Sequence, residues 1–158
     1  MQRTKTLAGL LLIPIILLLA YMELTANLGM RQSAAVGHIL TSVAASVLII
    51  YLAIQFRLKQ RKFHKEVAYL MAFLGILSLY FAWQYGFAIQ VSFNAISMHN
   101  IFGFVSLALS LIPVAIKPGG KHRLHCRIAT AAAIFAVLSI VTGIIGYQHL
   151  ILNVFGMR

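Results

Sequence analysis

Acidic residues are almost absent from this chain of 158 residues. It contains Glu23, Glu66 and no aspartate, against thirteen lysines and arginines, so that its formal net charge is +11. Charged residues make up 9% of the sequence, whereas 61% of it is hydrophobic. A soluble domain of this length needs far more charge to cover its surface. The scarcity of charge therefore excludes an ordinary soluble domain and predicts an integral membrane protein.

Other absences narrow the function. The single cysteine, Cys126, cannot form a disulfide within the chain, and one thiol beside His125 does not make a zinc site. No carboxylate falls in the middle of a hydrophobic run, which disfavours a transporter or channel with a proton path. The aromatic residues lie mostly within the hydrophobic runs and not between the basic ones, so we expect no nucleic-acid partner.

Five hydrophobic runs fill the chain. Each has about the 20 residues that a helix needs to cross about 30 Å of hydrocarbon. They lie at about 6–26, 34–56, 66–90, 96–116 and 124–148. We therefore predict an all-α membrane protein in which residues 1–158 form a single transmembrane domain of five helices. The helix at 6–26 is expected to be peripheral, and the other four to form a bundle over about 34–150.

The basic residues predict the orientation of these helices. Eleven of the thirteen lie before the first run, between the second and third runs, or at 117–127 around the start of the fifth run. The other side of the membrane receives Arg31 and Arg158. Because basic residues concentrate on the cytoplasmic side, we expect a cytoplasmic N-terminus in a multi-pass protein, of the kind found in a prokaryotic inner membrane.

Four of the six histidines lie where the last four runs begin. His38 and His99 open helices that run from the outer to the inner side, and His64 and His125 open helices that run back. The alternation places one pair of imidazoles towards each face of the membrane. Two imidazoles on facing helices, with a flat ring between them, are how a bundle holds a six-coordinate haem. We therefore predict two b-type haems, with His38, His99, His64 and His125 as the iron ligands.

Less specific interpretations stay open for several of these residues. His64 lies among basic residues and could be a solvated loop histidine, as could His122. His149 has the position of an interfacial residue. Either His122 or His149 could replace one of the four predicted ligands.

Small residues follow each predicted ligand by four positions, on the same helix face. They are Ser42, Ala68, Gly103 and Ala129. Small side chains leave room for a flat ring beside the helix, although such faces also serve plain helix packing.

The basic connections offer partners for haem propionates. Six cations lie close in sequence to His64 and His125: Arg61, Lys62, Lys65, Lys121, Arg123 and Arg127. Membrane orientation explains these cations equally well.

Two short segments resemble the cytochrome b561-type family. Residues 97–103, Ser-Met-His-Asn-Ile-Phe-Gly, look like that family's Ser-Leu-His-x-x-x-Gly segment, and residues 125–129 are similar to its His-Arg-x-x-Gly segment. The resemblance implies a four-helix core in which His38 and His99 hold an outer haem and His64 and His125 an inner one. It also implies transmembrane electron transfer, with a quinol or a redox partner protein as the donor.

Two other functions compete with this interpretation. The chain could be a non-haem structural or assembly subunit of a larger membrane complex, or a small transporter with histidine relays. As partners we expect the subunits of such a larger complex or a second copy of this chain in a homodimer. Bound haem distinguishes the electron carrier from both, and any enzymatic activity would then be that of a membrane oxidoreductase.

Overall fold

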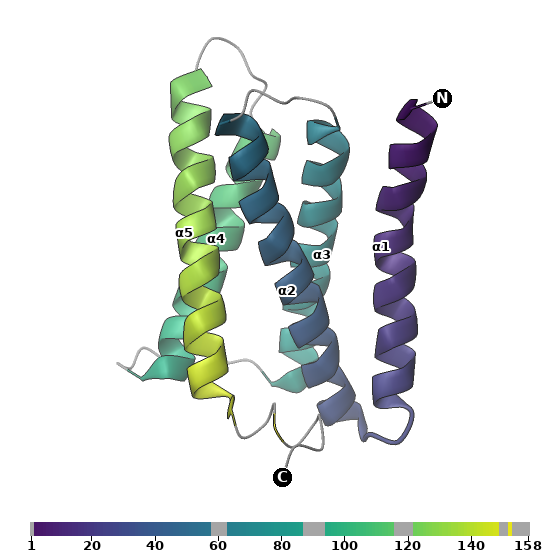
Figure 1. Cartoon of the computed structure of the whole chain (residues 1–158). Helices are drawn as coiled ribbons and strands as arrows, with labels where there is room; N and C mark the ends of the chain where they lie inside the picture. The colour runs from purple at the N-terminus through teal and green to yellow at the C-terminus, as the bar shows by residue number, and fades with distance from the viewer. Residues whose placement is uncertain (1, 58–62, 87–93, 116–121, 149–151, 153–158) are drawn as a thin grey trace.

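The computed structural model describes residues 2–57, 63–86, 94–115, 122–148 and 152. Of residues 2–11, 56, 57, 114, 115 and 122 it describes the backbone only. Within the described residues the chain forms five α-helices (Figure 1), which confirms the predicted all-α class. They are α1 (Gln2–Thr25), α2 (Met30–Arg57), α3 (His64–Tyr85), α4 (Ala95–Ala115) and α5 (His122–Gly146).

Helix boundaries differ from the predicted runs where local backbone signals decide them. α2 begins four residues before the predicted start at residue 34. α3 ends at Tyr85, because Gly86 has φ 99° and its N–H bonds back to the carbonyls of Ala82 and Trp83. Such left-handed capping by glycine is a common helix stop. Asn94 caps α4, since its side-chain Oδ1 accepts a hydrogen bond from the Ser97 N–H at 2.8 Å.

Four of these helices are long and apolar enough to cross a membrane. The segments concerned are Met30–Gln55, His64–Tyr85, Ala95–Pro113 and Arg123–Gly146. In α1, the part with described side chains is the shorter apolar stretch Leu12–Thr25. These four helices thus have the lengths and composition of a multi-pass membrane protein. The fifth span, predicted at 6–26, includes residues 6–11, whose side chains are not described.

Two helical hairpins form the bundle. α2 packs extensively on α3, and α4 packs extensively on α5. The hairpins meet mainly along α2 and α5, while α3 and α4 touch over a smaller area. α1 stands beside this bundle and contacts α2 (Figure 1). Its Tyr21 ring also lies 5.4 Å from the Phe81 ring of α3, measured between centroids.

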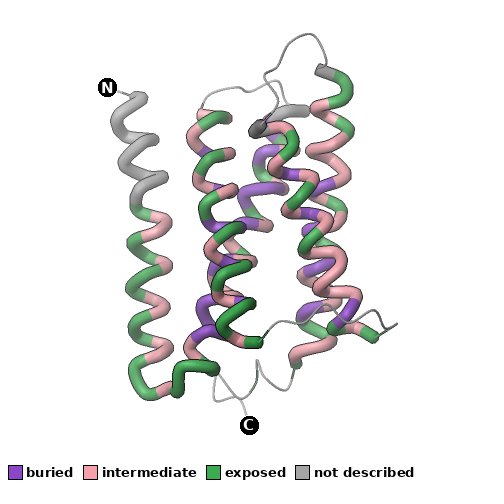
Figure 2. Tube along the Cα trace, turned by 180° about the vertical axis from the view of Figure 1, so that it is seen from behind, coloured by how far each residue is buried: buried purple, intermediate pink, exposed green. Residues whose placement is uncertain are grey.

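The distribution of side chains is that of a protein in lipid. Large apolar side chains face outward, including Leu19 at 61%, Tyr69 at 62% and Trp83 at 77% exposure. Several serines are buried between the helices instead, among them Ser78, Ser106 and Ser139. Figure 2 shows the exposed residues along the outer faces of the helices and the buried ones turned inward. Large exposed apolar areas mark a membrane surface, and small polar residues between helices allow them close approach.

The α2–α3 hairpin depends on a close contact at Gly37. A Cβ atom built on Gly37 would lie 2.7 Å from the Phe81 ring, which Tyr21 restrains from the other side. We expect Gly37→Ala to lower the free energy of unfolding by about 1–3 kcal/mol, because an overpacked ring must shift. Thermal unfolding in detergent measures this change. Gly29→Ala is the control, since nothing lies within 4 Å of a Cβ there, and an equal loss in both variants would contradict the prediction.

Candidate functional site

His38 and His99 meet across the bundle. His38 lies in α2 and His99 in α4, on helices that belong to different hairpins. Their ring centroids are 6.0 Å apart, and the ring planes are almost perpendicular at 86°. This pair lies towards the end of the bundle that carries the α1–α2 connection.

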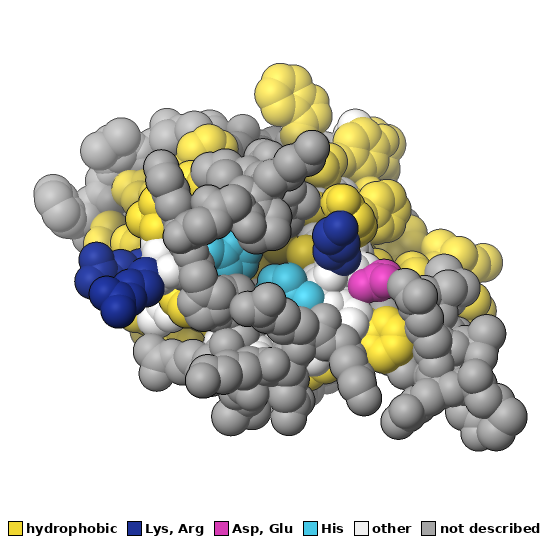
Figure 3. Space-filling view, turned by 90° about the horizontal axis from the view of Figure 1, so that it is seen from above, with side chains coloured by type: hydrophobic (Ala, Val, Ile, Leu, Met, Phe, Trp, Pro, Cys, Tyr) yellow, Lys and Arg dark blue, Asp and Glu magenta, His cyan; other side chains and the backbone are white. Residues whose placement is uncertain are grey.

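His64 and His125 meet at the opposite end. They lie in the first turns of α3 and α5, with ring centroids 5.9 Å apart and an angle of 49° between the planes. We call this end, which carries Lys65, Arg123 and Arg127, the basic end. Figure 3 looks onto it and shows histidine side chains in the middle, with lysine and arginine side chains on two sides of them.

The alternation of helix directions predicts the pairs His38–His99 and His64–His125, and the structure brings the two members of each pair together. Neither pair depends on His122, whose side chain is not described, or on His149, which lies outside the described residues. The described part of the chain has no group of three or more His, Cys, Asp or Glu side chains that could hold a metal ion. Each level thus offers two imidazoles, and their role as ligands stays a prediction.

A backbone carbonyl fixes the ring of each histidine in the first pair. His38 Nδ1 lies 3.0 Å from the carbonyl oxygen of Ser78, and His99 Nδ1 lies 2.8 Å from that of Ser139. A carbonyl oxygen can only accept a hydrogen bond, so the two carbonyl contacts are hydrogen bonds when Nδ1 of the neutral imidazole carries the proton. Nε2 then keeps its lone pair free for a metal, as second-shell partners commonly arrange.

The hydroxyl groups of the same serines lie beside these nitrogens. Ser78 Oγ is 3.0 Å from His38 Nδ1, and Ser139 Oγ is 3.2 Å from His99 Nδ1. Sequence reasoning missed both serines, although a signal was present. The same offset of 61 residues separates His38 from His99, His64 from His125 and Ser78 from Ser139. The two hairpins therefore repeat one arrangement, in which a serine 40 residues after the histidine holds its ring.

Two further residues restrict His99 and have no such repeat. A Cβ atom on Gly143 would lie 2.7 Å from His99 Nδ1, so a side chain there would displace the ring. The Tyr147 ring meets the His99 ring edge-on, with 5.6 Å between centroids. Burial raises the pKa of Tyr147, and the nearby Tyr85 raises it further, so the phenol stays neutral. The residue 61 positions before Tyr147 is Gly86, which leaves His38 without an equivalent aromatic neighbour.

A cavity lies between the four helices beside His38 and His99. Small residues from all four helices line much of it, including Ser42, Gly75, Ser78, Gly103, Ala136 and Ser139. Its volume is about 90 Å³. Leu107 of α4 also lines it and reaches so close to α3 that a Cβ atom built on Gly75 would overlap with Leu107 Cδ1, at 2.5 Å. Two of the small residues predicted to follow the histidines, Ser42 and Gly103, thus lie at this cavity.

The predicted propionate-binding cations divide into two groups. Lys65, Arg123 and Arg127 lie at the basic end and are exposed. Arg61, Lys62 and Lys121 lie outside the described residues. At the other end, Arg31 is exposed and stacks over the Tyr85 ring at 5.3 Å, while its Nε donates to the Tyr85 carbonyl at 3.1 Å.

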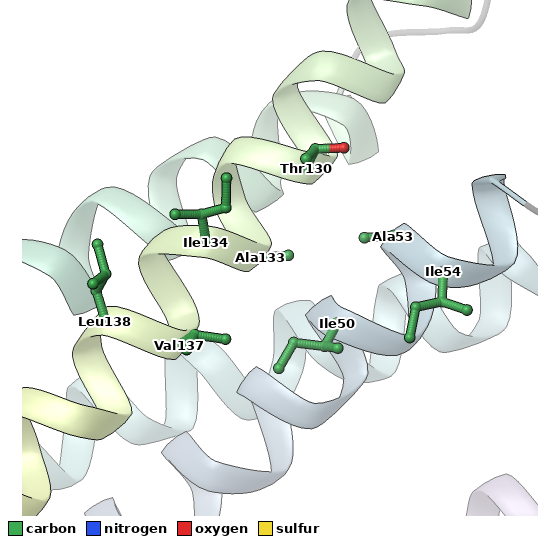
Figure 4. A pocket seen from close by; sticks show the side chains of 8 residues that line it. All are labelled: Ile50, Ala53, Ile54, Thr130, Ala133, Ile134, Val137 and Leu138. Carbon is green, nitrogen blue, oxygen red and sulfur yellow. The ribbon is translucent and has the colours of Figure 1, made fainter.

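A separate apolar groove of about 400 Å³ follows the outer surface between α2 and α5. Ala53 and Ala133 point towards one another across it, and Ile50, Ile54, Ile134 and Val137 form much of its sides (Figure 4). No histidine lines this groove, so it is distinct from both histidine pairs.

Comparisons with protein-family models, with curated proteins and with solved structures find no match for this chain. The chemistry of the site is therefore argued from its own geometry.

The carbonyl contacts predict the tautomers of two histidines. In the protein without bound ligand we expect ¹⁵N NMR to show His38 and His99 protonated at Nδ1 and not at Nε2, because each Nδ1 faces a carbonyl. Ser139→Ala keeps the Ser139 carbonyl in place, so His99 should keep this tautomer in that variant. An Nε2-protonated signal from either residue would contradict the interpretation.

Proposed function

We propose that this chain is a dihaem b-type membrane cytochrome, of the cytochrome b561 type, that carries electrons between the two faces of a membrane. The observation that carries the proposal is the meeting of two histidine pairs across the bundle, with ring centroids 6.0 Å and 5.9 Å apart. One pair lies towards each end of helices long enough to span a membrane.

The spacing of the rings fits two imidazoles that would together hold one iron. With a metal–nitrogen bond of about 2 Å and a ring centroid about 1.1 Å behind the nitrogen, such imidazoles lie about 6 Å apart. Two imidazoles in direct hydrogen-bonded contact would lie closer. The Nδ1 contacts to Ser78 and Ser139 support the proposal further, because they leave Nε2 of His38 and His99 available.

Small residues around the first pair also support a flat ring there. The cavity volume of about 90 Å³ is below the roughly 300–1,000 Å³ of typical ligand sites. A ring entering between His38 and His99 would therefore displace Leu107, which lies between α3 and α4, two neighbouring helices that touch over only a small area. Entry from that side separates helices that belong to different hairpins and leaves both hairpins intact.

The basic end suits the carboxylates of a haem. Lys65, Arg123 and Arg127 lie there, close in sequence to His64 and His125. Cations near propionates form charge-assisted hydrogen bonds, which hold the carboxylate in position and also balance its negative charge. By the distribution of basic residues, this end would face the cytoplasm.

The two histidine levels divide the width of the membrane. Ser78 is level with His38, and it lies 14 residues from His64 along α3, or about 21 Å at the rise of an α-helix. A haem supplies one-electron chemistry when it is bound. The residues of the chain would bind and orient the haem, supply apolar surroundings and exclude water. A quinol or a redox partner protein would deliver the electrons.

Purified protein from haem-replete cells is expected to be red, with a reduced-minus-oxidised spectrum of the b type and two haems per chain. His99→Ala should lose one haem and His64→Ala the other, because each removes one ligand of a different pair. Haem content and difference spectra measure both losses. A colourless preparation would instead favour a structural or assembly subunit.

A second variant tests the site without removing a ligand. Gly143→Ala places a methyl group against His99 Nδ1, so we expect it to weaken haem binding at the His38–His99 pair by about tenfold or more while the other haem stays bound. Gly29→Ala is the matched control. The proposal predicts a selective effect, and equal loss of both haems in Gly143→Ala would argue against it.

A further inference from the structure

Gln55 is a buried amide with one unused polar atom. It lies in the last turn of α2, and 7% of its surface is exposed. Its Nε2 contacts the Tyr51 hydroxyl, whereas its Oε1 has no hydrogen-bond partner. A buried polar group without a partner is costly, and such groups in folded proteins commonly bind something that the chain itself does not supply.

The position of Gln55 follows from the packing of α2. Leu48 and Leu52 belong to the hydrophobic core of the bundle, together with Val67 in the first turn of α3. Gln55 lies three residues after Leu52 and seven after Leu48, so it continues the same helix face. Its amide is therefore turned towards the interior of the bundle near the basic end.

The depth of Gln55 can be compared with that of His64. His38 and Ser78 are level, because they are hydrogen-bonded between antiparallel helices. Moving 14 residues from each along α2 and α3 reaches Leu52 and His64, which are therefore also level. Gln55 lies about 4–5 Å beyond that level, towards the basic end. This is the direction in which Lys65, Arg123 and Arg127 lie.

We propose that Gln55 binds a carboxylate of the group held between His64 and His125, which under the proposed function is a haem propionate. A half-turn of the amide makes Tyr51 O–H the donor to Gln55 Oε1 and frees Nε2. Nε2 then donates to the carboxylate oxygen from inside the bundle, while the surrounding cations act from the surface. This inference rests on the proposed function, and it adds a neutral, buried ligand to a set composed of exposed charges.

The test uses the His99→Ala chain, in which only the haem between His64 and His125 is expected. Gln55→Leu should speed the transfer of this haem to a haem-accepting apoprotein by about tenfold, because a hydrogen bond to a charged group is lost. The midpoint of thermal unfolding of the haem-free chain should stay equal or rise, because the unpartnered amide has gone. A purely structural role would lower this midpoint and leave haem transfer unchanged.

Two controls complete the experiment. Gln84→Leu changes an exposed glutamine at the other end of α3 and should alter neither quantity. Gln55→Met provides a second apolar variant, in case leucine disturbs the packing. Haem transfer at the parental rate in both Gln55 variants would overturn this inference alone, whereas absence of haem from the unmodified protein would overturn the proposed function.

Discussion

The structure depends on a match of register within each hairpin. The histidine of one helix reaches the carbonyl of a serine on the antiparallel neighbour, at 3.0 Å in α2–α3 and 2.8 Å in α4–α5. A shift of one residue along either helix would move the carbonyl by about 1.5 Å and turn it by about 100°. The imidazole would then lose the hydrogen bond that orients it and that keeps the proton on Nδ1. Packing of α2 on α3 and of α4 on α5 therefore decides where the imidazoles can point.

Small and weakly polar residues between the helices, beside the apolar core, help to maintain this register. In lipid, helices gain little from burying leucine, so small and weakly polar residues between them determine close approach. Ser106 donates to the Ala132 carbonyl at 2.9 Å across α4 and α5, and Ser139 holds His99 nearby. Such contacts fix each hairpin firmly. α3 and α4 contact one another over a smaller area than the helices within each hairpin do. On that side of the bundle the two hairpins can therefore move apart without breaking the hydrogen bonds within either hairpin.

Much of this arrangement could be predicted from the sequence, for identifiable reasons. Helix length and the alternation of helix direction are enough to place His38 level with His99, and His64 level with His125. Helix ends were harder, because the stop at Gly86 lies within an apolar run that continues beyond it. Ser78 and Ser139 were missed because their role depends on hairpin register, which hydropathy does not report. The constant spacing of 61 residues was the available signal, and it exceeds the periods of common repeat proteins.

The 61-residue offset also shows where the two hairpins differ. At the shared positions the histidines and serines are the same, whereas Tyr147 stands opposite Gly86 and Leu107 opposite Ser46. Both differences lie around His99 or its cavity, so the two imidazoles of that pair have unequal surroundings. Hydrogen bonds and packing around an axial ligand tune the iron that it holds. The two hairpins thus share their histidine–serine contacts, and Tyr147 and Leu107 are residues by which the second hairpin differs from the first.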